Sequence, residues 1–338
     1  QNGYNGAAAL IAQVQDQGID FIYGMDDAIL QGAIQALEEA GFNVGVPADG
    51  ADADIIAVGT VCNGDRQLME EGRQYGTTLQ APLLEGQLAI QVADEYLTSG
   101  SVENFLNFTP NPKVRYDEWA DFTLEGFDGA TYTMDSLCTW GSSDAGAAEP
   151  VEAEEEVAEE EMDEEMAVEP GSSGTIIAFT PARSERYVNG LIQGLGNEAE
   201  NAGYEITILE NEFNQAQQDE QVQQQLAIGA EPDLWIWWPA EGAAGLGSLR
   251  DLAATGIPVL QINQLPSADA EEFVIGYAGP DDGLRARNAG EMMVQARDAW
   301  VEAGKELSSE GGNAIGVTYP IAYGGYPLSI EAFNSGID

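Results

Sequence analysis

Short apolar runs alternate with amphipathic segments from residue 175 onward. Runs such as 175–180 (TIIAFT) and 234–238 (LWIWW) are nearly all apolar, which is typical of strands buried on both faces of a sheet. Between the runs, apolar residues recur at helical spacing. This alternation predicts a parallel, doubly wound sheet. The strands expected are 175–180, 204–209, 234–238, 258–262, 273–277 and 314–318, and the helices are 185–202, 215–228, 245–255 and 284–303.

The first hundred residues follow the same rhythm, so the α/β class is predicted for both stretches. Residues 101–140 contain Pro110, Pro112 and scattered aromatic side chains, a composition that predicts irregular strands and turns. The strands expected in the first stretch are 21–23, 55–61 and 77–79, and the helices are 6–15, 28–40, 66–74 and 84–97.

An acidic tract separates the two stretches. Twelve of the 21 residues from 149 to 169 are Asp or Glu, and none is Lys or Arg. Such a run repels itself and has little apolar surface to bury. Small residues flank it, at 141–143 and 171–174, which is the composition of a flexible linker. We therefore expect residues 141–174 to be a solvated linker between two globular parts.

Charge and composition exclude several classes of function. The chain has 59 acidic and 11 basic residues, and outside the tract the acids still outnumber the bases about fourfold. Nucleic acid and anionic lipid need clusters of Lys and Arg, so neither is an expected partner. Solubility explains the charge, and a specific cationic partner is the alternative. The chain has no His, and we expect neither a metal nor a cofactor.

The two cysteines leave two readings open. Cys62 and Cys138 lie far apart in the sequence and form no CxxC or zinc-binding pattern. They fit one disulfide if the protein is exported, or two buried thiols if it is not.

Several motifs resemble one protein family. Residues 22–41 (IYGMDDAILQGAIQALEEAG) resemble the second lobe of type I periplasmic sugar-binding proteins, the ribose- and galactose-binding receptors of ABC transporters. Residues 77–82 (TTLQAP) and the following Glu85-Gly86 resemble the T-x-x-Q-x-P segment of that family. Residues 273–282 (FVIGYAGPDD) resemble its crossover between lobes. The resemblance implies two doubly wound parallel-sheet lobes with a hinge and a central cleft.

The two stretches occur in the opposite order to that of the family, like a circular permutation joined by a linker that resembles a lipoprotein spacer. Relative to the family, we expect one strand of the second lobe, about 8–12 residues, to be missing. The expected organisation is the main part of the second lobe at 1–110, a return segment at 111–140, the linker at 141–174, the first lobe at 175–280, and the crossover with the start of the second lobe at 281–338.

The resemblance also implies a ligand set at the carboxyl ends of the strands. Planar polar groups that grip adjacent hydroxyls, together with aromatic faces, are suited to a sugar. Gln80 matches the Gln of the family motif, and Asp26 and Asp27 match its Asn-Asp. Asp281 and Asp282 fit either ligands or hinge and helix-capping residues. Side chains alternate between the two faces of a strand, so Trp235 and Trp237 lie on the opposite face from Trp238 and are expected in the core. The candidate ligands are Arg183, Glu185, Arg186, Tyr187, Trp238, Glu241, Asn263, Gln264, Asp281, Tyr319, Tyr323, Asp26, Asp27, Asn63 and Gln80.

The function implied is an extracytoplasmic receptor, expected as a monomer, that closes around a small sugar or polyol and delivers it to an ABC permease. No enzyme is expected. The alternatives are a ligand-sensing module of chemoreceptor or quorum-signal type, which differs only in its partner, and a sugar enzyme that uses paired carboxylates. The apolar runs are all shorter than the ~20 residues of a membrane span.

Overall fold

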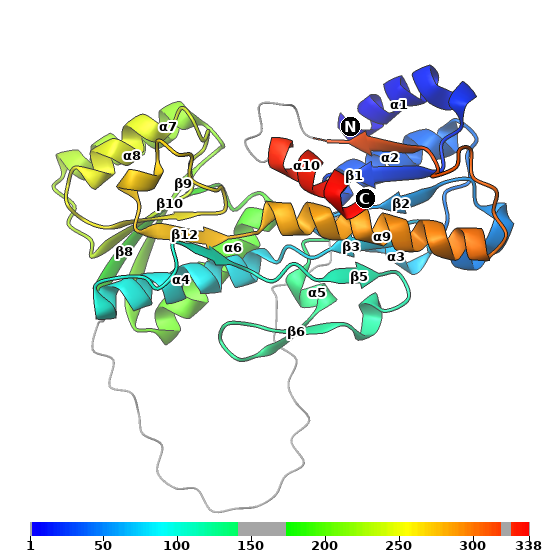
Figure 1. Cartoon of the computed structure of the whole chain (residues 1–338). Coiled ribbons are helices and arrows are strands. Elements are labelled where there is room, and N and C mark those ends of the chain that lie inside the picture. The colour runs from blue at the N-terminus through cyan, green and yellow to red at the C-terminus, as the bar shows by residue number, and fades with distance from the viewer. Residues whose placement is uncertain (1, 141–173, 319–325, 338) are drawn as a thin grey trace, which may run out of the picture.

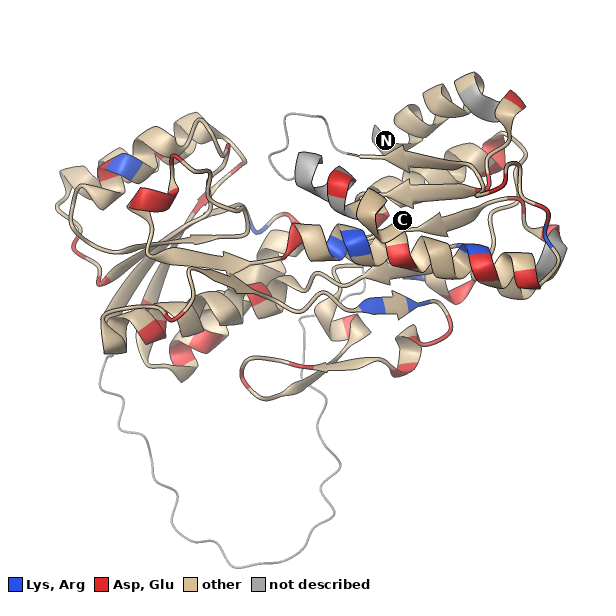
Figure 2. Ribbon diagram, viewed as in Figure 1, with Lys and Arg blue, Asp and Glu red and all other residues tan. Residues whose placement is uncertain are grey.

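The computed structural model describes residues 2–140, 174–318 and 326–337 (Figure 1). The expected linker, except Gly174, lies outside the described residues. Two sheets lie side by side, each flanked by helices. Within the described residues, no helix combines the length and apolar character needed to cross a membrane. Acidic residues are spread over the helices and loops of both parts, and basic residues are few (Figure 2).

One sheet has five strands in the order β13-β1-β2-β3-β5. All neighbours are parallel except β5, which runs antiparallel to β3. Its strands are β1 (Phe21–Gly24), β2 (Ile56–Val58), β3 (Gly76–Thr78), β5 (Lys113–Arg115) and β13 (Ala314–Val317).

Helices cover both faces of this sheet. On one face, Ile11 and Ile34 pack with Ile22 of β1; on the other, Met292 and Trp300 pack against its neighbour Phe21. Successive strand residues thus enter opposite cores, which explains why the strands are apolar throughout. The helices are α1 (Asn2–Val14), α2 (Asp27–Glu39), α3 (Arg66–Glu70), α9 (Asp282–Glu302) and α10 (Tyr326–Ile337).

The other sheet has six parallel strands in the order β4-β12-β11-β10-β8-β9. Its strands are β4 (Leu106–Phe108), β8 (Gly174–Pro181), β9 (Tyr204–Asn211), β10 (Leu234–Trp237), β11 (Val259–Ile262) and β12 (Gly276–Gly279). Its helices are α4 (Pro82–Ser99), α6 (Arg186–Asn201), α7 (Gln215–Ala227) and α8 (Leu246–Ala253).

Close approach of α4 and α6 seals one face of the six-stranded sheet. A Cβ added at Gly86 of α4 would lie 2.3 Å from the carbonyl oxygen of Leu191, and one at Gly194 of α6 would lie 2.1 Å from that of Leu83. On the opposite face, Trp235 and Trp237 pack with residues of α7 and α8. Both tryptophans are fully buried, which confirms their predicted place in the core.

Each sheet receives a strand from the other half of the chain. β13 pairs with β1, and β4 pairs with β12. The chain therefore crosses between the sheets at residues 79–81, 109–112 and 280–281. The expected boundary at residue 110 needs correction, because α4 and β4 belong to the six-stranded sheet. The apolar residues of α4, from Leu88 to Ala93, pack against α6 and the strands, which is the physical reason for this placement.

A small hairpin and a disulfide complete the fold. β6 (Thr123–Glu125) pairs antiparallel with β7 (Thr131–Thr133), and α5 (Met134–Leu137) follows. A disulfide joins Cys138, after α5, to Cys62, after β2, with the Cα atoms 5.3 Å apart. Gln91 of α4 donates to the carbonyl of Phe127 at 2.6 Å, so the hairpin also contacts a helix of the six-stranded sheet. This segment touches both parts of the molecule.

The prediction of an α/β fold with parallel sheets is confirmed. One strand is displaced from the expected range 273–277, because Glu271–Phe273 form a short 3-10 helix and β12 begins at Gly276. The carbonyl of Ser267 accepts from the N–H groups of Ala270 and Glu271, which starts this turn. Short 3-10 helices also occur at Gln15–Gln17, Pro47–Asp52 and Trp119–Asp121.

Candidate functional site

Strained backbone marks the carboxyl ends of the strands. Val61, Cys62, Phe213 and Asn263 have φ values of 81°, 54°, 51° and 61°, a region that residues other than glycine rarely adopt. Each lies within four residues of the end of β2, β9 or β11. Strain of this kind costs about 1–3 kcal/mol and concentrates at functional sites. The edges where parallel strands end are also where α/β sheets bind ligands.

Four polar side chains meet at this edge of the six-stranded sheet, and we call them the Glu85 cluster: Gln80, Glu85, Tyr187 and Asn263. Asn263 Nδ2 donates to Glu85 Oε2 at 2.9 Å, and Gln80 Nε2 donates to Glu85 Oε1 at 3.1 Å. The Tyr187 hydroxyl donates to Glu85 Oε1 and accepts from Gln80 Nε2. Three of these residues were predicted ligands, and Glu85 joins them.

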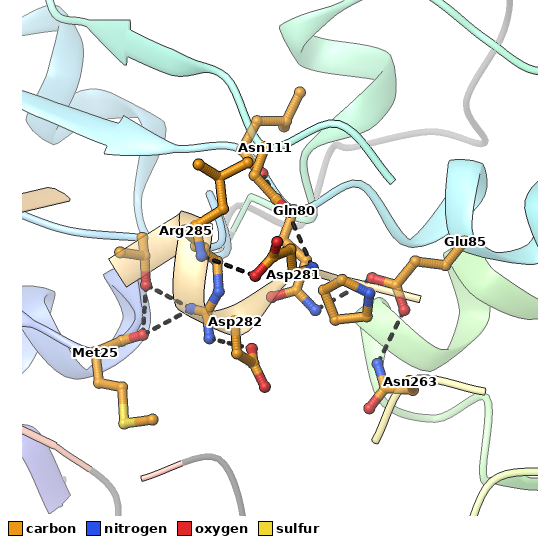
Figure 3. A network of polar contacts seen from close by, with 12 residues as sticks. Met25, Gln80, Glu85, Asn111, Asn263, Asp281, Asp282 and Arg285 are labelled. Carbon is orange, nitrogen blue, oxygen red and sulfur yellow. Dashed lines mark hydrogen bonds and ion pairs between the residues drawn. The ribbon is translucent and has the colours of Figure 1, made fainter. Parts of the chain in front are cut away.

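The cluster brings together separate segments. Gln80 lies in the first crossing segment, Glu85 in the first turn of α4, Tyr187 at the start of α6, and Asn263 directly after β11. Pro82, at the first position of α4, fixes the start of this helix and so places Glu85 one turn inside it. Figure 3 shows the contact between Glu85 and Asn263, with Gln80 beside them.

Burial dominates the electrostatics of the cluster. Glu85 is 1% exposed, and its hydrogen-bond donors are neutral groups. Burial raises the pKa of Glu85 to about 7, although hydrogen bonds from Tyr187, Asn263 and Gln80 oppose the shift. Burial and the neighbouring Glu85 carboxylate also raise the pKa of Tyr187. Glu85 thus changes charge near neutral pH, and Tyr187 remains a phenol.

Aromatic rings adjoin the cluster. The ring of Trp238 meets Tyr187 edge to face, with centroids 6.3 Å apart, and Phe213 meets Trp238 at 6.5 Å. Trp238 is buried, and its Nε1–H has no hydrogen-bond partner among the described residues. Phe213 is 48% exposed. Aromatic faces beside polar groups are the combination expected for a sugar, whose C–H surface packs on rings.

A second network ties the crossing segments together (Figure 3). Asn111 donates to the carbonyl of Leu79 at 2.9 Å and accepts from the N–H of Asp281 at 3.2 Å. Asn111, Leu79 and Asp281 belong to the three different crossings, so one buried amide links all of them. The three crossing segments are therefore connected to one another.

Arg285, at the start of α9, anchors this region to the five-stranded sheet. Its guanidinium pairs with Asp282 at 2.7 Å and donates to the Met25 carbonyl at 3.1 Å and to Thr60 Oγ1 at 2.7 Å. Met25 follows β1 and Thr60 follows β2. Asp282, left open as ligand or capping residue, therefore serves as the buried partner of Arg285.

Asp27, another predicted ligand, lies apart from the Glu85 cluster and makes internal contacts. It is fully buried and accepts from Gln74 Nε2 at 2.8 Å and from Thr77 Oγ1 at 2.7 Å. Burial raises the pKa of Asp27 to about 8; the hydrogen bond from Thr77 opposes this shift, and the charge of Asp26 adds to it. Because β3 and the turn before it supply the donors, Asp27 ties the start of α2 to β3.

Three other predicted ligands bond to helix N-termini. Asp26 is 2% exposed and caps α2 by accepting from the N–H of Ile29 at 2.6 Å. Asn63 accepts from the N–H of Ala28 at 3.1 Å. Asp281 caps α9 by accepting from Leu284 at 2.8 Å, which favours the capping alternative. Short polar side chains are preferred at such positions because the first N–H groups of a helix lack backbone partners.

The side chains in the loop before α6 and at the start of α6 have two different surroundings. Tyr187 faces the Glu85 cluster, whereas Arg183 pairs with Glu210 at 2.6 Å and Arg186 donates to the Trp140 carbonyl. Both arginines line a cavity of about 150 Å³ between α6, the start of α4 and the segment around Cys138. Glu185 is exposed and makes no capping hydrogen bond. The two arginines therefore do not join the cluster.

The remaining predicted ligands lie at the margin of the Glu85 cluster or outside the described residues. Gln264 Nε2 donates to the Pro239 carbonyl at 3.4 Å, and Glu241 is exposed. Tyr319 and Tyr323 lie outside the described residues. Among the residues that the structure describes, no group of three or more His, Cys, Asp or Glu side chains is arranged to hold a metal ion.

Sequence reasoning missed Glu85, Asn111 and Arg285. Glu85 stands one turn after Pro82, which is a signal for a side chain directed toward the crossing segment. Asn111, between Pro110 and Pro112, is the one polar side chain in a stretch where proline removes backbone donors. Arg285 is one of few basic residues in an acidic chain, and its position near Asp281-Asp282 was the available signal.

Comparisons with known proteins give no family assignment. No family model matches the chain, and no curated protein matches it. Solved structures with related chain paths exist, and those described below are at most 20% identical to this chain.

Two of these structures cover most of the chain. A periplasmic sugar-binding protein from Pseudomonas fluorescens is 13% identical, with a TM-score of 0.42 over 99% of this chain and 77% of that chain. A substrate-binding protein of a sugar ABC transport system from Bordetella parapertussis is 12% identical, with a TM-score of 0.42 over 94% and 74%.

A solute-binding protein from Clostridium phytofermentans with bound β-D-glucose is 20% identical, with a TM-score of 0.32. Only 36% of either chain is covered, so this chain spans about a third of the length of that relative. Likenesses of this degree carry no functional argument, and the proposal below is based on the residues of this chain.

Proposed function

We propose that the protein is a non-enzymatic receptor for a small sugar or polyol, bound between the carboxyl edges of its two sheets. The Glu85 cluster is the observation that carries this proposal. Amide, phenol and carboxylate groups from separate segments converge there, beside the rings of Trp238 and Phe213. Neutral hydrogen-bonding groups and aromatic faces suit a neutral polyhydroxylated ligand better than an anion.

The ligand contacts expected are Gln80, Tyr187, Asn263 and Trp238. Gln80 is 7% exposed and Trp238 4%, and Gln80, Tyr187 and Asn263 hydrogen-bond within the Glu85 cluster in the described conformation. A ligand that uses them must replace those contacts, which requires the two parts to separate and close again. The three crossings joined by Asn111 are suited to this hinge motion.

The proposal extends to the place of the receptor in a transport system. An extracytoplasmic monomer that passes its ligand to an ABC permease fits the resemblance in residues 22–41 and 77–82, and the disulfide fits an oxidising compartment. The proposed lobes are the two sheets with their helices, in circularly permuted order relative to the family.

A thermal-shift screen of the full chain against monosaccharides and polyols tests the proposal. A ligand at 100 times its Kd stabilises the folded state by about 2.7 kcal/mol, which raises the melting temperature measurably. Gln80→Ala should remove the ligand-induced shift, whereas Gln224→Ala on the exposed face of α7 should retain it. A cooperative melt that no sugar or polyol shifts would contradict the proposal.

A further inference from the structure

Glu85 differs from the other members of its cluster because it accepts hydrogen bonds from all of them. One carboxylate oxygen accepts from Tyr187 and from Gln80 at 3.1 Å, and the other accepts from Asn263 at 2.9 Å. Glu85 is itself 1% exposed. It is therefore too enclosed to be the main ligand contact, but it touches each of three proposed ligand-binding side chains.

An ionised carboxylate is an acceptor only, and this matches three donors converging on it. Protonation turns one of its oxygens into a donor, so at least one of the three groups must then turn away or lose its partner. A buried polar group that loses its hydrogen-bond partner costs free energy, so the cluster would rearrange instead. The arrangement of Gln80, Tyr187 and Asn263 thus depends on the charge of Glu85.

We propose that Glu85 is a positioning residue, which in its ionised form holds Gln80, Tyr187 and Asn263 in binding geometry and so makes ligand affinity fall at acid pH. The inference rests on the proposed function, because it names the regulation of the same site.

The charged and titratable groups around Glu85 favour a single titration step of the cluster in the accessible pH range. Tyr187 on α6 has a raised pKa and stays protonated, and Gln80 and Asn263 do not titrate. From α9, the charge of Asp282 adds to the raised pKa of Glu85, and the charge of Arg285 acts on Tyr187. Within the cluster, Glu85, with a pKa raised by burial to about 7, is therefore the group whose charge changes near neutral pH.

The size of the change in Kd follows from the fraction of molecules in which Glu85 is ionised, because this is the form competent to bind ligand. With a pKa of about 7, roughly one tenth of the molecules carry an ionised Glu85 at pH 6. Apparent affinity scales with the competent fraction, so the Kd should be about tenfold weaker at pH 6 than at pH 8.

Two measurements on the full chain test this. The first uses no ligand: NMR of the labelled Tyr187 ring and of the Asn263 side-chain amide from pH 5 to 9. Both signals should shift with one midpoint near pH 7, and Glu85→Gln should abolish the shift. Asp94→Asn is the matched control, because Asp94 also lies on α4 and accepts from a tyrosine hydroxyl, that of Tyr204 at 2.7 Å, away from the cluster.

The second measurement is the Kd of the sugar found by thermal shift, at pH 6 and pH 8. The wild-type protein and Asp94→Asn should show the tenfold change, and Glu85→Gln should show weak, pH-independent binding. Absence of the NMR transition in the wild-type protein would overturn the inference even if Glu85→Gln failed to fold. A pH-independent wild-type Kd would overturn it as well. An intact NMR transition with no sugar bound at any pH would instead overturn the proposed function and support the positioning of the cluster by Glu85.

Discussion

Two buried acids, one at the carboxyl edge of each sheet, have the same chemistry and different surroundings. Glu85 and Asp27 are each at most 1% exposed, and burial raises their pKa values to about 7 and about 8. Asp27 accepts from Thr77 of β3 and from Gln74 in the turn before it, close to each other in the chain and in the same half of the molecule as Asp27. Glu85 accepts from a crossing segment, a helix and a strand end. Burial and a shifted pKa alone therefore do not identify a binding site. What distinguishes Glu85 is that its hydrogen-bond donors come from separate segments of the chain.

The edge of the five-stranded sheet should depend most on its disulfide. Cys138→Ser removes the link to Cys62, which closes a separation of 76 residues, and we expect the free energy of unfolding to fall by about 2–5 kcal/mol. Urea denaturation of the variant and of the wild-type protein under oxidising conditions measures this. Equal midpoints would mean that the disulfide adds nothing to this edge.

Asp27→Asn should flatten the pH dependence of stability. The folded-state pKa of Asp27 lies above its unfolded value, so the native state binds the proton more tightly, and stability falls as pH rises from about 4 to about 8. Asn does not titrate, so this contribution, on the order of 1 kcal/mol per pH unit, should disappear. Denaturation at pH 5, 6, 7 and 8 tests it, with the exposed Asp121→Asn as control. Parallel pH profiles for both variants and the wild-type protein would refute the buried role of Asp27.

The six-stranded side should be sensitive to the contact between α4 and α6. Gly194→Ala places a methyl group 2.1 Å from the Leu83 carbonyl, and overpacking of this kind costs about 1–3 kcal/mol. Gly196→Ala on the same helix meets open space and should stabilise by up to about 1 kcal/mol through helix propensity. Thermal melts compare the two variants. The same sign of change in both would show that the helices are not in close contact.

The smallest effect expected is that of Tyr187→Phe. It removes one of the donors to Glu85 and should lower stability by about 0.5–1.5 kcal/mol at pH 8, where Glu85 is ionised. At pH 5 the loss should be smaller, because a protonated Glu85 accepts fewer hydrogen bonds. Melting curves at the two pH values check this. A loss that is larger at pH 5 would contradict the arrangement of the cluster.

The fold was more predictable than the site. Apolar strands such as 175–180 and 234–238 and the helical periodicity between them determine the α/β class, because both depend on local sequence. The placement of α4 and β4 on the six-stranded sheet depends on packing against α6 and on pairing with β12, which no local pattern records.

The candidate site shows the same division. Gln80, Tyr187 and Asn263 were predicted ligands because the resemblance implied them, and they meet. Asp26 and Asp27 have equally suitable positions, but Asp26 caps α2 and Asp27 ties the start of α2 to β3. Whether an acid at a strand end faces a ligand or a neighbouring N–H or O–H donor is decided by residues distant in sequence, such as Gln74 and Thr77. The resemblance alone could not separate the two cases.

Hydrogen exchange by mass spectrometry, with and without the sugar found by thermal shift, tests the central claim most directly. Ligand should slow exchange in residues 79–81, 183–187 and 263–264, at the carboxyl edge of the six-stranded sheet and the first crossing. Residues 229–232 and 255–257, which flank the opposite ends of its strands, should be unaffected. Protection confined to those opposite loops, or absent from the residues around the Glu85 cluster, would contradict a binding site at this edge.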